Sequence, residues 1–432
     1  MVQVERHFDA EACAYTIDFR QQCPPTPGQP EKLPFHIPVA MALLDQDGRE
    51  LPLRLSGENA PQAGMRVLQV CQAQDTFVFQ DVDKMPVPSL LRGFSAPVRM
   101  EIDYTDAELG FLLAHDPDPF CRWEAGQQLG VRLLLELAGA WQRGEELAVP
   151  PTFIAAMRAV LTAEDLDPSF RSVALTLPGE TYRAEDMAEI DPQALHAARL
   201  MLRRVMADQL SDAWLKCYQS RAGSGPYRID ALSMGRRSLH NLCLSYLMEL
   251  EDDAEILGIC LGQFEQADNM NDRFAALTAL TQREDAVADR CLEKFYDDWQ
   301  ASPQVLDKWL AVQATSRRND TLQRVEALSR HPAFSLRNPN KVYALLRSFG
   351  QANPARFHAG TDGAAYRFMA EQIVELDAIN PQVAARLAGV FNAWNSYAEP
   401  YRSGMQEALQ HMHNQPKLSP DLYEILYKSL DS

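Results

Sequence analysis

Thr105-Asp106-Ala107-Glu108 is the stretch at which the chain changes its structural character. Thr and Glu three positions apart form the capping-box pattern, in which the two side chains satisfy free backbone amides at the start of a helix. The pattern of residues before this stretch indicates β structure, and the pattern after it indicates helices. We therefore predict two domains, one of residues 1–105 and one of residues 106–432.

Proline usage supports the same boundary. Of the 27 prolines, 11 precede residue 105, and none of these follows Ser, Asn or Asp. Nine later prolines do follow such a residue, which can cap the free amides of a helix start while proline occupies a position whose N–H is not needed. Eight of these pairs are interpreted as helix starts and begin at Asp118, Asp167, Asp191, Ser302, Asn338, Asn353, Asn380 and Ser419; the ninth, Asp116-Pro117, directly precedes the first of them.

The first 105 residues carry strand patterns. Tyr15, Ile17 and Phe19 alternate with polar residues, which is the period of a half-buried strand. Residues 39–44 and 51–55 flank an Asp47-Gly48 step, which predicts a hairpin. Further short strands are expected at 67–71, 76–79 and 98–102. Several strands without intervening helices predict an Ig-like β-sandwich.

Residues after 105 carry helical patterns. One apolar stripe at spacings of three and four runs from Leu195 to Trp214, and similar stripes recur to Leu430. No fixed period with a repeating consensus accompanies them. The prediction is an irregular α-helical superhelix of the HEAT or armadillo kind.

Composition and charge restrict the partners. The chain has 41 Lys and Arg against 59 Asp and Glu, a net charge of -18. A surface this acidic repels phosphate backbones and anionic lipids, so we expect no nucleic-acid partner. No run of about 18 apolar residues exists, and the stretch at residues 133–137 is interrupted by Glu136, so no segment is expected to span a membrane. The first residues also lack a secretory signal, so a cytoplasmic location is expected.

The common catalytic motifs are missing from the sequence. A zinc peptidase of the usual type needs His-Glu-x-x-His on a helix, and none of the nine histidines has that spacing. His411 and His413 are two apart and diverge on a helix. The eight cysteines include no Cys-x-x-Cys pair. The residues alone therefore predict a binding or supporting module without a cofactor or metal of its own.

Several phrases in order along the chain resemble bacterial aminopeptidase N. The first group resembles its β-sandwich domain: residues 27–38, 43–48, 76–79 and 86–98, the last containing Pro86-Val-Pro-x-Leu-Leu91-Arg-Gly-Phe-Ser-Ala-Pro97-Val. The second group resembles its C-terminal helical domain: Asn269-Met-Asn-Asp272, Asp307-Lys-Trp309, Gln313-Ala-Thr-Ser316, Asn338-Pro-Asn340, Asn353-Pro-Ala-x-Phe-His358, Asn380-Pro-Gln-Val-Ala-x-Arg386 and Asp421-Leu-Tyr-Glu424.

The resemblance implies that this chain is the non-catalytic C-terminal portion of a zinc aminopeptidase that removes N-terminal residues from peptides. In that family the zinc ligands and the catalytic Glu lie in a preceding domain, which is absent here and is the expected partner together with short peptides. A chain that starts with Met1 directly before strand-like sequence is what a truncated protein would show. The family's helical domain forms the lid and walls of the substrate chamber, so this chain alone is expected to be inactive.

The resemblance also selects chamber residues. Arg386 matches a family arginine that points toward the site, where its planar fork could hold a peptide carbonyl or carboxylate. Asn338, Asn340, Lys341 and Tyr343 are the other chamber-lining candidates. Asn338 and Asn340 are equally interpreted as cap and turn formers. Tyr343 stands where related sequences can carry Arg, which weakens a carboxylate-binding role for that position. Trp309 and Gln313 are expected to pack rather than to contact substrate.

Two alternatives stay open from the sequence. One is an autonomous helical-repeat scaffold that binds a protein partner through a concave face. The other is a glycosidase-like helical barrel, although the paired carboxylates that it needs are not identifiable in the sequence.

Overall fold

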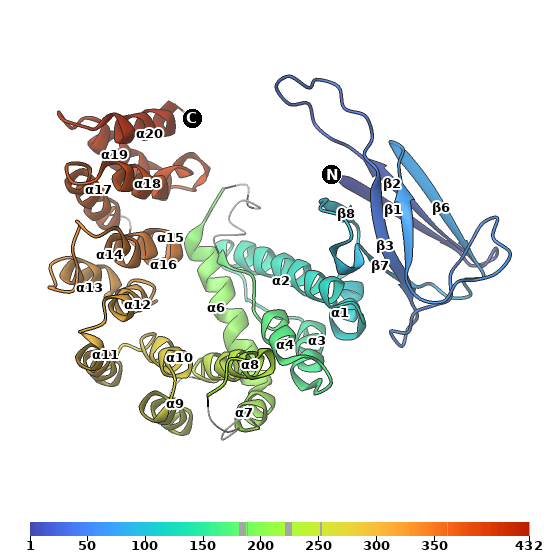
Figure 1. The fold of residues 1–432 in the computed structure, drawn as a ribbon, viewed down its shortest axis with the longest axis horizontal. Coiled ribbons are helices and arrows are strands. Elements are labelled where there is room, and N and C mark those ends of the chain that lie inside the picture. The colour runs from blue at the N-terminus through green and yellow to red at the C-terminus, as the bar shows by residue number, and fades with distance from the viewer. Residues whose placement is uncertain (181–186, 188, 221–226, 251–252, 361, 432) are drawn as a thin grey trace. The chain divides into compact units, whose positions relative to one another are not determined.

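The structure is a computed structural model that describes residues 1–180, 187, 189–220, 227–250, 253–360 and 362–431. The chain divides into two compact units (Figure 1). The first consists of Met1–Arg132 and Val149–Leu177, and the second of Leu133–Ala148 and Pro178–Ser432. Each unit is described by itself below.

Eight strands form two sheets within residues 1–105, all of which are described. The strands are β1 (Val2–Asp9), β2 (Ala14–Gln21), β3 (Ile37–Leu44), β4 (Arg54–Leu55), β5 (Arg66–Val70), β6 (Gln74–Gln80), β7 (Val87–Leu90) and β8 (Met100–Ile102). One sheet has the order β4-β6-β2-β1-β8 and the other the order β5-β3-β7. All neighbours are antiparallel except β1 and β8, which run parallel.

The sandwich core follows the alternation in the sequence. Tyr15, Ile17 and Phe19 of β2 are completely buried and belong to one apolar cluster with Val39 of β3 and Phe79 of β6. Alternate residues of β3 face this cluster, and Ala40 and Ala42, which point to the opposite face of the sheet, are buried as well. The strand is therefore covered on both faces. A strand buried on both faces has a continuous apolar sequence, as residues 39–44 do. The strands predicted at 67–71, 76–79 and 98–102 also form, with ends shifted by one or two residues.

The hairpin predicted between residues 39–44 and 51–55 is only partly correct. Gly48 adopts a positive φ of 81° in the expected turn, and Leu44 bridges Glu50. Beyond Leu51 the chain leaves β3, and β4 pairs with β6 of the other sheet. Pro52 has no N–H to continue the ladder with β3. Leu53 is instead buried in the core between the sheets.

The predicted helix start at Thr105 is confirmed. Thr105 accepts a hydrogen bond from the Glu108 amide, and the Glu108 carboxylate accepts one from the Thr105 amide. The helices that follow are α1 (Asp106–His115), α2 (Pro119–Gln142), α3 (Pro151–Thr162) and α4 (Pro168–Ala174). Helices α1, α3 and α4 belong to the first compact unit, whereas α2 begins in the first unit and ends in the second.

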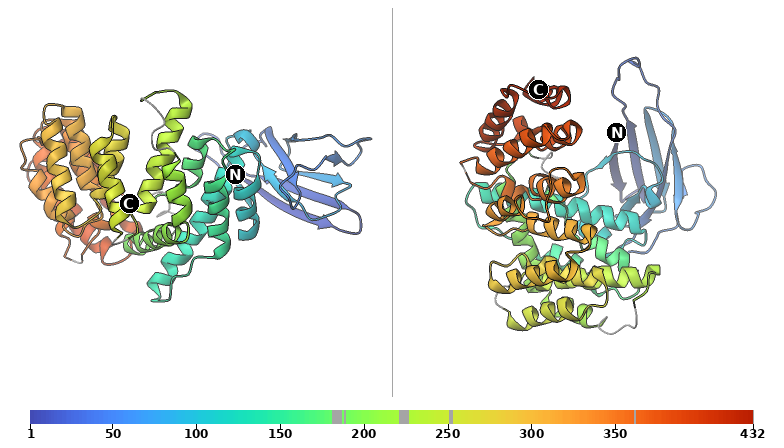
Figure 2. Two further views of the ribbon diagram at one scale, coloured as in Figure 1. Left: turned by 90° about the horizontal axis from the view of Figure 1, so that it is seen from below. Right: turned by 60° about the vertical axis from the view of Figure 1, so that its left-hand side comes forward.

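The second unit is built from helices that follow one another in chain order (Figure 2). They are α6 (Pro192–Gln209), α7 (Ser211–Gln219), α8 (Ala231–Leu247), α9 (Ala254–Gln266), α10 (Met270–Leu280), α11 (Ala286–Trp299), α12 (Pro303–Ala314), α13 (Thr321–Leu328), α14 (Pro339–Val342), α15 (Ser348–Ala352), α16 (Pro354–Phe357), α17 (Ala364–Asp377), α18 (Pro381–Ala388), α19 (Tyr401–His413) and α20 (Pro420–Asp431). A π-helix, η3 (Tyr343–Arg347), joins α14 to α15, and η1 (Arg92–Phe94), η4 (Gly389–Phe391) and η5 (Trp394–Ser396) are 3₁₀ turns.

The eight polar-proline pairs predicted as helix starts all begin helices, with proline as the first helical residue of α2, α4, α6, α12, α14, α16, α18 and α20. The apolar stripe from Leu195 to Trp214 is divided between α6 and α7, because Leu210 leaves the helical conformation at φ -114° and ψ 14°. Consecutive helices pack on each other along the unit, as α7 does with α8 and α9 with α10. Within the described residues, no helix combines the length and apolarity needed to cross a bilayer.

Candidate functional site

Arg386 lies in the last turn of α18 and its side chain is exposed. Within the part of the chain that the structure describes, this guanidinium has no ion pair and no side-chain hydrogen bond. The helix begins at Asn380, whose side chain accepts a hydrogen bond from the Val383 amide. A capped helix thus holds an arginine whose donors are all available to another molecule.

Asn338 and Asn340 are exposed at the start of α14. Asn338 acts as the helix cap, because its side-chain oxygen accepts a hydrogen bond from the Asn340 amide at 3.0 Å. The cap role that the sequence predicted for Asn338 is therefore present in the structure. Exposure leaves the Asn340 side chain free for contacts beyond the chain.

Lys341 is buried and lies between α14 and α12. Its ammonium donates to the Pro303 carbonyl oxygen at 2.8 Å and is 2.9 Å from Asp307 Oδ1. Its side chain is only 8% exposed, so it has little surface to offer a ligand. This environment makes Lys341 a structural link between two helices. Tyr343 is half-buried, with the Arg347 guanidinium over its ring at 5.6 Å from the centroid.

Trp309 and Gln313 are packing residues, as the sequence predicted. Both are buried on α12. The Trp309 indole donates to the Leu292 carbonyl oxygen, and the Gln313 amide donates to the Trp309 carbonyl oxygen.

The sequence reasoning did not predict a cavity of about 580 Å³ in the second unit. Residues of α6, α8, α10 and the segments around Arg317 and Asn353 line it. The charged lining residues are Glu180, Arg199, Arg203, Glu249 and Arg317. With His196 neutral, three arginines face two carboxylates, so the lining is net positive in a chain whose total charge is -18.

Glu249 joins two of these arginines. It is buried, and it accepts hydrogen bonds from Arg203 Nε at 2.7 Å and from both terminal nitrogens of Arg317 at 3.0 and 2.7 Å. Burial alone raises the pKa of Glu249, but the attraction of Arg203 and Arg317 outweighs it and holds the pKa below its ordinary value. The ion cluster ties the end of α8 to α6 and to the segment after α12.

In the part of the chain that the structure describes, Arg199 forms no ion pair with a carboxylate. Its Nε donates to the Pro178 carbonyl oxygen at 3.0 Å, and within the described residues its two terminal nitrogens have no partner. Burial lowers the pKa of Arg199 below its ordinary value, and repulsion from Arg203 adds to this effect. An arginine is charged at every physiological pH all the same. Among the described residues, the cavity wall therefore carries a partly buried positive charge that is attracted by Glu180 and Glu249 but forms no ion pair with either.

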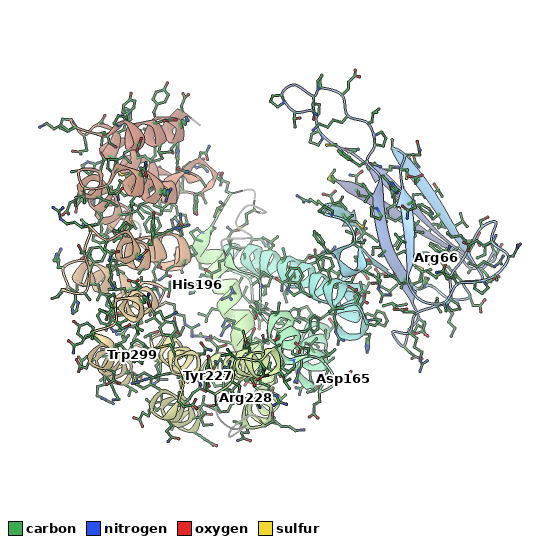
Figure 3. All side chains as sticks on the ribbon, viewed as in Figure 1. Arg66, Asp165, His196, Tyr227, Arg228 and Trp299 are labelled. Carbon is green, nitrogen blue, oxygen red and sulfur yellow. The ribbon has the colours of Figure 1, made fainter. Side chains whose placement is uncertain are left out.

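His196 lies one turn before Arg199 on the same face of α6 and is labelled in Figure 3. Its Nδ1 is 3.1 Å from Glu180 Oε1, and within the described residues its Nε2 has no partner. A carboxylate acceptor at Nδ1 favours a proton there, which leaves the Nε2 lone pair free in the neutral ring. The spacing of His196, Arg199 and Arg203 by three and four positions is the sequence signal that could have revealed this wall.

No group of three or more His, Cys, Asp or Glu side chains in the described residues could hold a metal ion. The described residues therefore do not fit a zinc site.

Comparisons with known proteins relate both parts of the chain to one family. A family model described as Ig-like, the domain of unknown function DUF3458, matches residues 1–103. A second, described as ARM repeats and named DUF3458_C, matches residues 106–431. The chain belongs to the DUF3458 family. The predicted fold class, an Ig-like β-sandwich followed by an armadillo-like helical region, is confirmed.

The curated relatives of this DUF3458 chain are aminopeptidases. Aminopeptidase N of Escherichia coli is 37% identical over 431 residues, which cover 100% of this chain and 49% of that protein. Aminopeptidase N of Haemophilus influenzae is 33% identical and covers 98% of this chain and 48% of the relative. Aminopeptidase N of Caulobacter vibrioides is 37% identical over 431 residues, which cover 99% of this chain and 48% of that protein. The chain spans about half the length of the curated relatives it matches.

A solved structure leads to the same conclusion. Aminopeptidase A of Legionella pneumophila, in complex with aspartic acid, matches with a TM-score of 0.82 and 29% identity over 100% of this chain and 48% of its own. The predicted resemblance to the C-terminal portion of bacterial aminopeptidase N is thus confirmed.

Proposed function

We propose that this chain forms the lid and walls of the substrate chamber in a zinc aminopeptidase that removes N-terminal residues from peptides. The observation that carries the proposal is that the whole chain aligns with about half of each of three proteins named aminopeptidase N. The catalytic reaction belongs to the other half in this proposal. The complete enzyme is expected in the cytoplasm.

The zinc of this proposal is held outside the chain, where it would activate a water molecule for attack on the peptide bond. The residues of this chain act by contact with the peptide. Exposed Arg386 has no partner for its terminal nitrogens among the described residues and can hold a peptide carbonyl or carboxylate through two parallel hydrogen bonds. Asn340, also exposed, offers a side-chain amide to the same chamber.

The division of roles between the two halves can be tested by complementation. The purified chain is assayed with alanine p-nitroanilide, alone and after mixing with the separately produced polypeptide encoded upstream in the same reading frame. We expect no hydrolysis by either part alone and hydrolysis by the mixture. Robust hydrolysis by this chain alone, or the lack of an upstream His-Glu-x-x-His segment, would contradict the proposal.

The role of Arg386 can be tested in the complete enzyme. We expect Arg386→Ala to lower kcat/KM for a tripeptide by about tenfold, since a charge-assisted hydrogen-bond pair is lost. Cleavage of alanine p-nitroanilide, which has no second peptide bond to hold, should change by less than about twofold. Arg330 is a matched control, because it is an exposed arginine without a side-chain partner in the described residues. An equal loss of kcat/KM for both substrates would contradict the role of Arg386 as a peptide-binding residue of the chamber wall.

The family model for residues 106–431 is described as ARM repeats. This description supports one alternative function, a scaffold that binds a protein partner. The complementation experiment separates the two functions, because a scaffold has no reason to restore hydrolysis. Failure to restore it, with a folded chain and an intact catalytic half, would favour the scaffold.

A further inference from the structure

The cavity in the second unit combines two kinds of surface. Its polar wall carries the terminal nitrogens of Arg199 and the Nε2 of His196, which have no hydrogen-bond partner among the described residues. Its other walls include Leu200, Met248 and Pro354, which are apolar. A volume of about 580 Å³ lies within the usual range of roughly 300–1,000 Å³ for small-molecule sites. The cavity therefore suits a ligand with a charged end and an apolar body.

The charge of the cavity identifies the charged end as an anion. Arg203 and Arg317 share Glu249 and are neutralised in part, whereas no carboxylate of the described residues forms an ion pair with Arg199. A buried charge without a counter-ion is costly, and an incoming anion removes that cost. The two terminal nitrogens of a guanidinium match the two oxygens of a carboxylate.

The neighbouring histidine adds a second requirement. In the neutral tautomer with the proton on Nδ1, where Glu180 accepts it, His196 presents a lone pair at Nε2, and a lone pair needs an N–H or O–H donor. An N-acylated α-amino acid carries a carboxylate and an N–H on the same carbon atom. Because His196 and Arg199 are one turn apart on α6, one such group can reach both.

We propose that this cavity binds an N-acylated α-carboxylate with an apolar side chain, as found in an N-acyl amino acid or at the C-terminal end of a peptide. Arg199 binds the carboxylate of the ligand, and His196 Nε2 accepts a hydrogen bond from its N–H. Leu200 and Met248 contact the apolar side chain of the ligand. The inference does not depend on the proposed function, since the whole cavity lies within one compact unit of this chain.

The test is calorimetric titration of this chain with N-acetyl-leucine, its C-terminal amide, hexanoate and inorganic phosphate. The acetyl group removes the free amine that an aminopeptidase centre would recognise. We expect N-acetyl-leucine to bind at least tenfold more tightly than each of the other three probes. Binding of the acid and the amide within twofold of each other, equal binding of phosphate, or no binding of N-acetyl-leucine at 10 mM would overturn the proposal.

A longer probe, N-acetyl-trialanyl-leucine, distinguishes the two sources of the ligand. Binding as tight as that of N-acetyl-leucine indicates a peptide end. Binding of N-acetyl-leucine alone indicates a free small molecule. Both results support the shared chemistry of the site.

Variants connect the binding to the cavity. Arg199→Gln should weaken binding of N-acetyl-leucine by about 10–100-fold, because the charged hydrogen-bond pair is lost, and Arg199→Lys should weaken it less. Arg236→Gln is the matched control with the same change in charge, since Arg236 is exposed on α8 and does not line the cavity. It should bind within twofold of the unchanged chain.

A second variant keeps the test valid if Arg199→Gln does not fold. Thr278 is exposed at the cavity wall, so Thr278→Trp fills space without altering the buried charges. Binding of N-acetyl-leucine should fall at least tenfold while the circular dichroism spectrum is unchanged. Full binding by a folded Thr278→Trp variant would place the ligand elsewhere and overturn the proposal.

Discussion

The interior of the β-sandwich and the interior of the helical unit are stabilised by different kinds of contact. In the sandwich, the buried cluster consists of apolar and aromatic side chains such as Ile17, Phe19 and Phe79. In the helical unit, buried polar side chains also link the helices: Glu249 joins two arginines, and the Asn353 amide donates to the carbonyl oxygens of Ala314 and Ser316.

The difference has a backbone origin. Strands satisfy their amides and carbonyls by pairing with one another, so the space between two sheets can be filled with apolar groups alone. Helices satisfy these groups internally, except for the first amides at each N-terminus and the last carbonyls at each C-terminus. Ala314 ends α12, and Asn353 reaches its carbonyl oxygen from another helix start. The helical unit therefore depends on specific polar contacts where the sandwich depends on packing.

The largest effect is expected in the sandwich. Phe19→Ala removes a completely buried ring from the core between the sheets and should cost about 3–5 kcal/mol of stability. Hydrogen exchange of β1, β2 and β6 amides measures the loss where it occurs. Val67→Ala, at a side chain that is 46% exposed on β5, is the control and should cost under about 1 kcal/mol. A loss below 1 kcal/mol for Phe19→Ala would show that packing does not dominate this region.

The next largest loss of stability is expected when the ion cluster around Glu249 in the helical unit is disrupted. Glu249→Gln leaves Arg203 and Arg317 without their counter-charge and should cost about 2–3 kcal/mol, less than for a fully buried pair because Arg317 is 26% exposed. Hydrogen exchange in α6 and α8 is the measurement. Glu293→Gln, at an exposed carboxylate on α11, is the matched control. Equal protection in both variants would show that the cluster contributes nothing.

The pH dependence of the same cluster has a definite sign. The folded pKa of Glu249 lies below its unfolded value, so the stabilisation is present above about pH 4.5 and is lost as pH falls through the folded pKa. Glu249→Gln should therefore lose less stability than the unchanged chain between pH 5 and pH 3.

His358 should produce a smaller effect in a different pH range. It is buried beside Tyr366, with Nδ1 2.7 Å from the tyrosine hydroxyl, and burial lowers the pKa of His358 from 6.5 to about 3. The unfolded chain therefore binds an extra proton between these values, and stability falls as pH drops from 6.5 toward 3. The loss at pH 5 relative to pH 7.5 should be about 2 kcal/mol.

The measurement for His358 is the difference in denaturant stability of the helical unit between pH 7.5 and pH 5, in the unchanged chain and in His358→Gln. Glutamine does not titrate, so the variant should lack this part of the pH dependence. The same slope in both proteins would mean that His358 is not the group responsible.

The smallest effect on stability is expected for Arg386→Ala. The side chain is exposed and makes no polar contact within the described residues, so the change should stay within about 0.5 kcal/mol. The measurement is thermal unfolding of the Arg386→Ala and Lys341→Met variants. Lys341 is buried against Asp307, so Lys341→Met should lower the stability more than Arg386→Ala does. A large loss for Arg386→Ala would make it a structural residue like Lys341.

Local patterns predicted most of the fold. Alternation in residues 15–19 predicted β2, the Thr105 capping box predicted α1, and eight polar-proline pairs predicted helix starts. The prediction was incomplete where partners are distant in sequence. Residues 51–55 were assigned to a hairpin with β3, but Pro52 ends that ladder and β4 joins β6.

The candidate site was predictable only through resemblance to a known family. Lys341 and Arg386 follow similar Asn-Pro starts and are both basic, yet one is buried in an ion pair and the other is exposed. The sequence around Lys341 does not reveal Asp307, because that partner lies on another helix. Their different roles depend on which helices pack together.

The order of β structure before helices, the helix starts and the acidic charge were determined by the sequence itself, since each depends on residues a few positions apart or on composition. The cavity was decided by tertiary structure alone. Its walls come from segments between Gly179 and Ala355, and helix packing brings Arg199, Glu249 and Arg317 together. The reason is physical: a local pattern fixes which face of a helix is buried, whereas the charge left unpaired on that face depends on every helix that packs around it.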